Sequence, residues 1–344
     1  METGSEPPSS SHGSSSWRRA RADAIGKCSS LKEHIVATNP QNSAPEGYFD
    51  QLEGCGFSPG WAKREPQMWA EPRRRFVPTV WRYREALDAL TKATEFVSTE
   101  FAERRNLILV NPIENNIYPT CRHLVAAYQL VLPGETARSH RHSPNALRLV
   151  LDATEGVYTL VDGIRVDMAP GDVVLTPQWH WHGHANYSDT PAFWIDFLDV
   201  PLVQNLENMF FEHHPDTLEA VTGEAPDSEL RFKGGLLKDR ATQEGDHRFG
   251  EAHMPTIALH AINLSQGQGQ DHDARIDNSI FAVTAGEISV EVEKLGSVSM
   301  TRGDVLVIPS WYGYSLQGGA GGGTMLRVTD TPVFEKLGFR DVRV

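Results

Sequence analysis

His140-Arg141-His142 places two imidazoles one residue apart, and His182 follows 40 positions after the pair (182 − 142), behind Pro177. Side chains alternate across a β-strand with period two, so His140 and His142 are expected on the same face of one strand. The apolar and β-branched run at 149–161 then ends in Asp162-Gly163, a strong hairpin signal. A pair of imidazoles and a distant third, each placed by a strand, is how a β-barrel builds a mononuclear metal site. The spacing therefore predicts a β-barrel with metal ligands His140, His142 and His182.

A second stretch of the chain repeats part of this pattern. The nine residues of Gly171-Asp172-Val173-Val174-Leu175-Thr176-Pro177-Gln178-Trp179 return as Gly303-Asp304-Val305-Leu306-Val307-Ile308-Pro309-Ser310-Trp311, with the same offset of 132 at both ends (303 − 171 and 311 − 179). Shared Gly, Asp, Val, Pro and Trp positions favour duplication over coincidence between two Gly-Asp hairpins. The sequence therefore predicts two barrels.

The same offset shows what the second barrel has lost. The positions 132 residues after the three histidines hold His272, Ala274 and Tyr314. Alanine offers no ligand atom and tyrosine is a rare ligand, whereas imidazole binds iron, zinc and copper well. We therefore expect a metal in the first barrel only.

Composition limits the possible partners. The 344 residues contain 32 basic and 45 acidic side chains, for a net charge of −13, which argues against nucleic acid or an anionic membrane as a partner. No apolar run approaches the roughly 20 residues of a membrane span. The three cysteines, Cys28, Cys55 and Cys121, are too few and too far apart for a disulfide framework, which fits a reducing compartment such as the cytoplasm.

The wider motifs resemble a known family. Gly134-x5-His140-x-His142 and Gly171-x5-Pro177-x4-His182-x3-Asn186 are similar to the two motifs of the cupin superfamily. The fuller stretches resemble the gentisate 1,2-dioxygenase group, which includes salicylate and 1-hydroxy-2-naphthoate ring-cleaving enzymes. These stretches are His140-Arg141-His142-Ser143-Pro144-Asn145-Ala146-Leu147-Arg148, Pro177-Gln178-Trp179-His180-Trp181-His182-Gly183-His184-Ala185-Asn186 and Trp194-Ile195-Asp196-Phe197-Leu198-Asp199-Val200-Pro201-Leu202. The glutamate that usually follows the cupin histidine pair is missing, because Asn145-Ala146-Leu147 occupies that stretch.

The resemblance runs from about Pro66 to the C-terminus and is strongest over 129–202. It implies an all-β core of two tandem cupin (jelly-roll, double-stranded β-helix) barrels with N-terminal helices. We expect a disordered tail over 1–45, a helical or irregular segment over 46–106, the metal-binding barrel over 107–202, a linker over 203–250 and the degenerate barrel over 251–344. Within 46–106, we expect irregular structure at 47–70 and helices at 81–90 and 98–105.

Arg148 is the first candidate for binding a substrate. Its even spacing from His142 places it on the same strand face, inside the barrel, where a buried cation needs an anion. That anion is either a substrate carboxylate, bound by the guanidinium fork, or an internal Asp or Glu. An arginine at the matching Ala-Leu-Arg position of the family binds the substrate carboxylate, and the resemblance implies this role for Arg148.

Further pocket residues follow from the resemblance. His184 shares a strand face with His182, and is either an orienting group or a proton donor or acceptor beside the substrate; the family favours the second role. Gln129 and Asp196 match positions that line the family's pocket, with Asp196 a second candidate for proton transfer. Either could equally be a structural polar group. Arg104 and Arg105 match an arginine pair of which one reaches the pocket.

The resemblance implies an Fe(II)-dependent dioxygenase that cleaves gentisate (2,5-dihydroxybenzoate) between its carboxyl- and hydroxyl-bearing carbons to give maleylpyruvate. Its partners would be this aromatic hydroxy-acid, O₂ and further copies of the chain in a homotetramer. Three alternatives stay open: the same chemistry on salicylate, 1-hydroxy-2-naphthoate or a secondary-metabolite phenol; a metal-dependent isomerase or decarboxylase; and a ligand-binding cupin without enzymatic activity.

Overall fold

The computed structural model describes residues 44–62, 68–98 and 104–339, and the chain divides into two compact units, 1–73 and 74–344. The first unit contains helix α2 (Tyr48–Gly54) and a short 3₁₀ helix (Gly60–Ala62). The irregular structure predicted over 47–70 is therefore wrong at α2, which has Asp50 in its first turn to complement the helix dipole. The tail predicted over 1–45 lies almost wholly outside the described residues.

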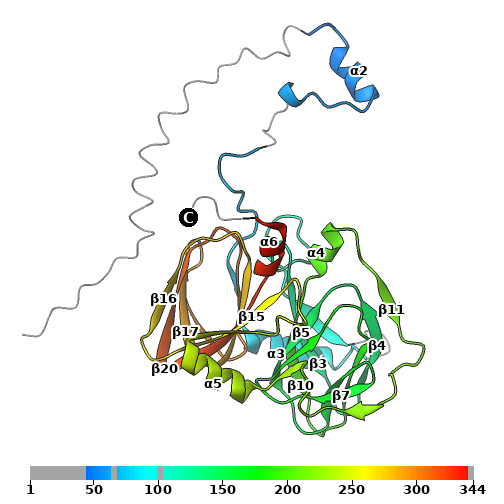
Figure 1. Cartoon of the computed structure of the whole chain (residues 1–344), viewed down its shortest axis with the longest axis vertical. Coiled ribbons are helices and arrows are strands. Elements are labelled where there is room, and N and C mark those ends of the chain that lie inside the picture. The colour runs from blue at the N-terminus through cyan, green and yellow to red at the C-terminus, as the bar shows by residue number, and fades with distance from the viewer. Residues whose placement is uncertain (1–43, 63–67, 99–103, 340–344) are drawn as a thin grey trace, which may run out of the picture. The chain divides into compact units, whose positions relative to one another are not determined.

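The second unit is built from two β-barrels, shown in green and in orange to red in Figure 1. One sheet of the first barrel has the order β13-β8-β5-β10-β3-β2 and the other has the order β11-β4-β9-β6-β7-β12. In those orders, the strands of the first sheet are Arg231–Phe232, Val173–Thr176, Ala146–Asp152, Ala192–Leu198, Val125–Val131 and Arg105–Ile108, and those of the second are Phe211–His213, Thr136–His142, His182–Asn186, Val157–Val161, Ile164–Asp167 and Gly223–Glu224.

The second barrel is one eight-stranded sheet with the path β1-β19-β17-β20-β15-β14, to which β16 and β18 are added through β20 and β17. These strands are Thr79–Trp81, Val305–Ile308, Ser279–Val292, Tyr314–Thr329, Ala258–Leu264, Asp246–Phe249, Gly269–His272 and Gly296–Thr301. The described residues of this unit also form the helices α3 (Tyr83–Ala93), α4 (Val200–Asn205), α5 (Gly234–Glu244) and α6 (Thr331–Leu337). The predicted fold of two β-barrels is confirmed. No helix among the described residues has the length and apolar character needed to cross a bilayer.

The helix predicted over 81–90 forms as α3, which buries Tyr83, Ala86 and Leu90 on one face. The helix predicted over 98–105 is wrong at its end, because Arg105 begins strand β2; residues 99–103 lie outside the described part. The stretch 203–250 contributes strands β11, β12 and β13 to the sheets of the first barrel, as well as helix α5.

The internal repeat is visible in the backbone. Gly171 and Gly303 both have φ 86°, a left-handed conformation that glycine adopts at no steric cost. Trp179 and Trp311 adopt φ 65° and 68°, which is costly for a residue with a side chain. Two barrels that keep the same unusual backbone at matched positions are most simply explained by duplication.

The two barrels exchange strands across their boundary. β1, which precedes the first barrel in the sequence, pairs with β19 of the second barrel, whereas β13, which precedes the second barrel, pairs with β8 of the first. The helices that follow, α3 and α5, pack on β2–β3 and on β14–β15, so each strand–helix unit touches both barrels. One hydrophobic core cluster accordingly draws on both barrels, from Leu151 and Phe193 to Val305 and Val328.

The aspartate of each repeated Gly-Asp hairpin fastens one of these units. Asp172 accepts a hydrogen bond from the first N–H of α5, at Gly234, and pairs with Arg231 at 2.6 Å. Asp304 does the same for α3, accepting from the N–H of Tyr83 at 3.0 Å and pairing with Arg82 at 2.7 Å. Both carboxylates satisfy an N–H at a helix N-terminus that has no partner within the helix.

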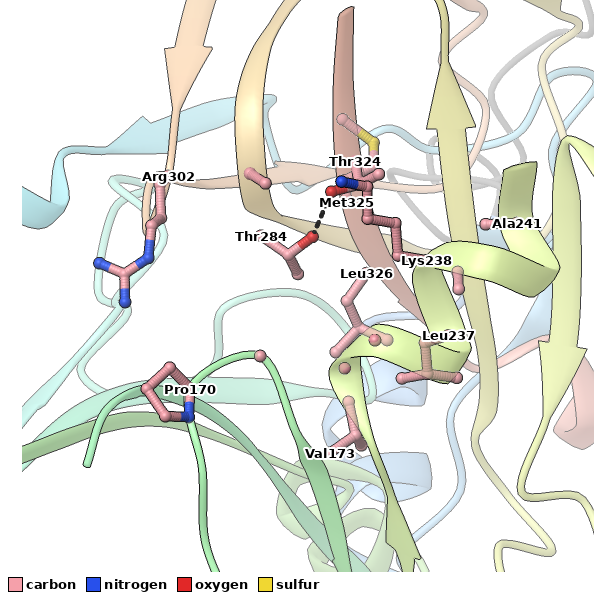
Figure 2. Close-up of a pocket in the computed structure, with 15 residues that line it drawn as sticks. Pro170, Val173, Leu237, Lys238, Ala241, Thr284, Arg302, Thr324, Met325 and Leu326 are labelled. Atoms are coloured by element: carbon pink, nitrogen blue, oxygen red, sulfur yellow. Dashed lines mark hydrogen bonds between the residues drawn. The ribbon is translucent and has the colours of Figure 1, made fainter. Parts of the chain in front are cut away.

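A cavity of about 240 Å³ remains where α5 crosses from one barrel to the other (Figure 2). Its walls are largely apolar, with Val173, Leu237 and Leu326 among them. At its edge, Arg302 is paired with Asp152 at 2.9 Å, so this cation already has its counter-ion.

Replacing Asp172 by alanine tests this fastening. The variant leaves the half-buried Arg231 without its carboxylate and one helix N–H unpaired, so its free energy of unfolding should fall by about 3 kcal/mol, measured by urea denaturation. Asp227→Ala is the matched control, because Asp227 is also paired with a cation, Lys233, but is exposed. Equal destabilisation by the two substitutions would contradict the role given to Asp172.

Candidate metal centre and substrate pocket

The three predicted histidines meet inside the first barrel. β4 carries His140 and His142, β9 begins at His182, and the register pairs His140 with His182. All three side chains are buried, and one ring nitrogen from each lies within 4.8 Å of the other two. The period-two spacing of the first two residues and the antiparallel pairing of β4 with β9 together produce this convergence.

Backbone carbonyls set the orientation of each ring. The Nδ1 atoms of His140, His142 and His182 lie 2.9, 2.8 and 2.9 Å from the carbonyl oxygens of Arg138, Pro144 and His180. A carbonyl oxygen can only accept, so each Nδ1 carries the proton and each Nε2 keeps its lone pair. Such a hydrogen bond on the far nitrogen is the usual support of an imidazole that binds a metal.

The surroundings also keep these rings neutral. Burial, with the nearby charge of Arg104 as the second cause, lowers the pKa of His140 to about 3. Burial likewise lowers the pKa of His142 and, further, that of His182, where the neighbouring imidazoles add to the effect. Three neutral Nε2 donors at this spacing fit a divalent transition metal, which needs unprotonated imidazole.

Arg148 lies fully buried next to the histidines. Its Nε donates to Asp196 at 3.3 Å, and its Nη1 donates to Thr159 at 2.8 Å and to Nδ1 of His184 at 2.8 Å. Asp196 is thus the internal anion that the sequence left open as one of two possibilities. The other oxygen of Asp196 accepts from Gln129 at 2.5 Å, so Gln129 and Asp196 together hold the guanidinium in place.

The contact with Arg148 decides the tautomer of His184. A guanidinium has no acceptor, so Nδ1 of His184 must be the acceptor and its proton must lie on Nε2. Burial and then the charge of Arg148 hold the pKa of His184 well below its usual range. Its Nε2 is buried and has no hydrogen-bond partner among the described residues. His184 therefore presents a free N–H donor and is poorly suited to accept a proton.

Comparison with known proteins gives this site its context. Residues 127–199 match the cupin domain family. A gentisate 1,2-dioxygenase from Streptomyces sp. is 32% identical over 335 residues, which cover 84% of this chain and 92% of the relative. This chain belongs to the gentisate 1,2-dioxygenase family.

Other members of the family agree on the reaction class but differ in substrate. Gentisate 1,2 dioxygenase 1 of Aquipseudomonas alcaligenes is 29% identical over 85% of this chain and 94% of its own length, and a 5-aminosalicylate 1,2-dioxygenase of Comamonas sp. is 28% identical over 86% and 91%. A salicylate 1,2-dioxygenase variant of Pseudoaminobacter salicylatoxidans, solved in complex with gentisate, superposes with a TM-score of 0.79 at 27% identity over 89% of this chain and 95% of that one. The protein is a ring-cleaving dioxygenase, and the isomerase, decarboxylase and ligand-binding alternatives are set aside.

The two neighbouring arginines of this dioxygenase have separate environments. Arg105 is buried and forms a two-pronged ion pair with Glu135 at 2.7 and 2.9 Å. Arg104 is half-buried, and its charge depresses the pKa of His140, His142 and His184, so its guanidinium lies near the candidate metal site. Of the predicted pair, Arg104 is the one whose charge acts on the site.

Sequence reasoning missed two members of the site. Thr159 accepts a hydrogen bond from Arg148 and lies 3.1 Å from Nδ1 of His184. It is buried on β6, and the only sequence signal for its role is that a polar residue stands in an otherwise apolar and aromatic strand. Phe211 stacks on His140 with ring centroids 5.2 Å apart, from strand β11 beside β4. No sequence signal marks Phe211, because it belongs to the stretch interpreted as a linker.

The described part of the second barrel has no comparable cluster. His272 stacks on Tyr314, with ring centroids 4.5 Å apart, and the pair occupies the register position of His140 and His182. Within the described ranges, the only group of three or more potential ligands close enough to hold a metal is that of the first barrel. The homotetramer, the cytoplasmic location and the predicted domain boundaries stay predictions.

Substitution of single histidines tests the metal centre of this dioxygenase. His182→Ala removes one of three donors and should reduce bound Co(II) or Fe(II) from about one equivalent per chain to almost none, measured by metal analysis after gel filtration. His272→Ala, the corresponding change in the second barrel, should leave the stoichiometry unchanged. One tightly bound equivalent in His182→Ala would refute the three-histidine site.

Proposed function

We propose that this protein is an Fe(II)-dependent gentisate 1,2-dioxygenase, which adds both atoms of O₂ to gentisate and opens the ring between its carboxyl- and hydroxyl-bearing carbons to give maleylpyruvate. The proposal rests chiefly on one observation: three neutral imidazoles face one another in the buried interior of the first barrel, beside Arg104 and Arg148. The family membership supplies the reaction class.

The donor set admits iron, and the reaction class favours it. Three imidazoles without a carboxylate would leave coordination positions open for substrate and O₂, as in the open non-haem Fe(II) sites, whereas a structural zinc site closes its coordination with a fourth protein ligand. Zinc held by three histidines would also keep an open position, but it has no redox chemistry to offer O₂. When bound, Fe(II) would supply coordination positions for substrate and O₂ and the electron transfer that O₂ chemistry requires.

The charges near the site suit an aromatic acid. The charge of Arg148 is balanced by Asp196, which fixes the guanidinium in place, whereas Arg104 adds a cation close to the histidines. We infer that Arg104 binds the substrate carboxylate. Arg148, whose guanidinium is held in place by Asp196, helps to orient the substrate as a second fixed cation. Cationic groups held rigidly before the substrate arrives orient it at little entropic cost.

His184 contributes a donor and not a base in this proposal. Its Nε2–H has a proton to share, and Arg148 at its other nitrogen opposes further protonation. We infer that His184 donates a hydrogen bond to the phenolic oxygen of the substrate and so stabilises the ionised form of that oxygen. Asp196 acts through Arg148, because hydrogen bonds engage both of its oxygens.

Gentisate is one of several aromatic hydroxy-acids that relatives of this chain are named for. Relatives named for 5-aminosalicylate and 1-hydroxy-2-naphthoate match this chain, as does a solved salicylate dioxygenase. A secondary-metabolite phenol stays a further alternative. Gentisate is favoured because several relatives with substantial coverage carry its name.

Oxygen consumption by the Fe(II)-loaded chain tests the proposal. With gentisate, we expect one O₂ consumed per ring opened, followed by an oxygen electrode and by the absorbance of the ring-opened product. Salicylate, 5-aminosalicylate and 1-hydroxy-2-naphthoate are assayed in parallel. Turnover of one of these with none of gentisate would keep the reaction class and refute the substrate.

The role of Arg104 gives a separate prediction. Arg104→Gln removes a cation from the substrate pocket and should raise the KM for gentisate at least about tenfold, the usual value of one charge-assisted hydrogen bond. Bound metal should not decrease, because the substitution also removes a charge that opposes cations near His140. Arg84→Gln, on the exposed face of α3, is the control; an unchanged KM in Arg104→Gln would refute the carboxylate role.

A further inference from the structure

Arg141 lies between two of the histidines in sequence but points to the opposite side of β4. Its guanidinium carbon lies 4.6 Å from the ring centroid of Trp179 and 4.4 Å from that of Trp181, so the cation contacts two aromatic rings. The same guanidinium donates to Glu212 on β11 through Nε at 2.8 Å and Nη2 at 2.6 Å. One side chain thus joins β4, the turn before β9 and β11.

The strand pairing explains why this turn needs support. The register between β4 and β9 shifts between Ala137 and His140, and His140 opposite His182 is the last pair before the strands separate. Beyond that pair, the chain forms a turn in which Trp179 has φ 65° and donates its N–H to the carbonyl of His142 at 2.8 Å. The position of His182 relative to His142 therefore depends on a short turn with a costly backbone conformation.

The second barrel provides an internal comparison. It keeps the left-handed tryptophan, as Trp311, and the backbone hydrogen bond, now donated to Arg275, one residue further along than the offset of 132 predicts. The positions that correspond by this offset to Arg141 and Trp181 hold Asp273 and Gly313. The second barrel, in which two of the three histidines are replaced, therefore also lacks the counterparts of Arg141 and Trp181, although it keeps the turn. The turn can form without these residues.

We propose that Arg141, Trp179, Trp181 and Glu212 form an external clamp that holds His140 and His142 at the correct distance from His182 for metal binding. Arg141 is a positioning residue: it lies on the outer side of β4 and acts on the metal through the strand that carries two ligands. The clamp also fixes β11, which places Phe211 against His140. Groups that hydrogen-bond metal ligands directly commonly change metal affinity by 10–100-fold when removed. Arg141 acts one step further out, through the strand and the turn that carry the ligands. This inference rests on the metal site of the proposed function.

The competing explanation is a surface contact that stabilises the barrel alone. Arg165 on β7 provides the matched control, because its guanidinium lies 4.6 Å from the ring of Tyr158 and pairs with Asp167 at 2.8 Å. The side chains of Arg141 and Arg165 are similarly exposed, at 27% and 29%. Arg165 makes the same kind of contact in the same barrel, on a strand that carries none of the three histidines.

The experiment measures the release of Co(II), used as an air-stable probe, from the full chain after addition of excess EDTA. Visible absorbance of the bound ion reports both its release and its coordination geometry. Arg141→Met should release Co(II) at least about tenfold faster than the wild type and should shift the absorption bands, while Arg165→Met stays within about twofold. Arg141→Lys, which keeps a cation but loses the fork to Glu212, should fall between them. The melting temperatures of the metal-free Arg141→Met and Arg165→Met variants should be lowered alike.

Equal release rates for Arg141→Met and Arg165→Met would overturn the clamp and leave the metal site intact. A metal-free Arg141→Met variant that melts well below Arg165→Met would also overturn it, because the effect would then belong to folding. Failure of the wild type to bind Co(II) or Fe(II) would overturn the metal site of the proposed function together with the clamp.

Discussion

Three hydrogen bonds from imidazole Nδ1 atoms to backbone carbonyls are the constraint on which the site depends. They join His140, His142 and His182 to carbonyls of their own loops and strands, so ring orientation is set by the backbone before any metal arrives. Burial keeps the rings neutral, which leaves three lone pairs directed toward one another in a space without a competing proton. Three lone pairs directed toward one another repel without a cation. The barrel maintains this arrangement because β4 and β9, which carry the histidines, are each paired with strands on both edges. A metal ion bound at Nε2 of the three histidines would stabilise these converging lone pairs.

A buried ion pair lies next to the three histidines. Arg148 is a buried cation that would be costly alone, and Asp196, held by Gln129, provides its counter-ion. The remaining hydrogen-bonding capacity of Arg148 reaches His184 and fixes the proton of that imidazole on Nε2. Because Asp196 fixes Arg148 and Arg148 occupies Nδ1 of His184, the network leaves His184 with an N–H donor at Nε2. The Arg148–Asp196 pair is close to neutral, and Arg104 adds a further positive charge near the histidines. In the proposed function, Arg148 is the arginine whose position is fixed, and Arg104 is the one that binds the substrate carboxylate.

The sequence predicted the two-barrel fold and selected three histidines that the structure brings together, because strand periodicity and an internal repeat are local properties of a chain. It left the partner of Arg148 open, since Asp196 lies on β10 and meets Arg148 only through strand pairing. The tautomer of His184 follows from its contact with Arg148, which strand spacing alone did not predict. The choice between Arg104 and Arg105 depended on Glu135, which no spacing rule connects to either. The helix expected over 98–105 is wrong at its end because pairing with β3 draws Arg105 into a strand, so tertiary contacts prevail over local helical preference.

Duplication separates what the barrel needs from what the metal centre needs. Both halves keep the Gly-Asp hairpin, the left-handed tryptophan and an aspartate that caps the helix of an exchanged strand–helix unit. These features hold the two halves together, and they persist where the ligands have gone. The second barrel thus retains a structural role. Its strand β19 pairs with β1, and its strands β14 and β15 pack against α5. The N-terminus of α5 in turn donates a hydrogen bond to Asp172 of the first barrel. A single metal-binding barrel would leave β1 and the buried face of α5 without partners. Loss of ligands from one half could therefore be tolerated in a way that loss of the half itself could not.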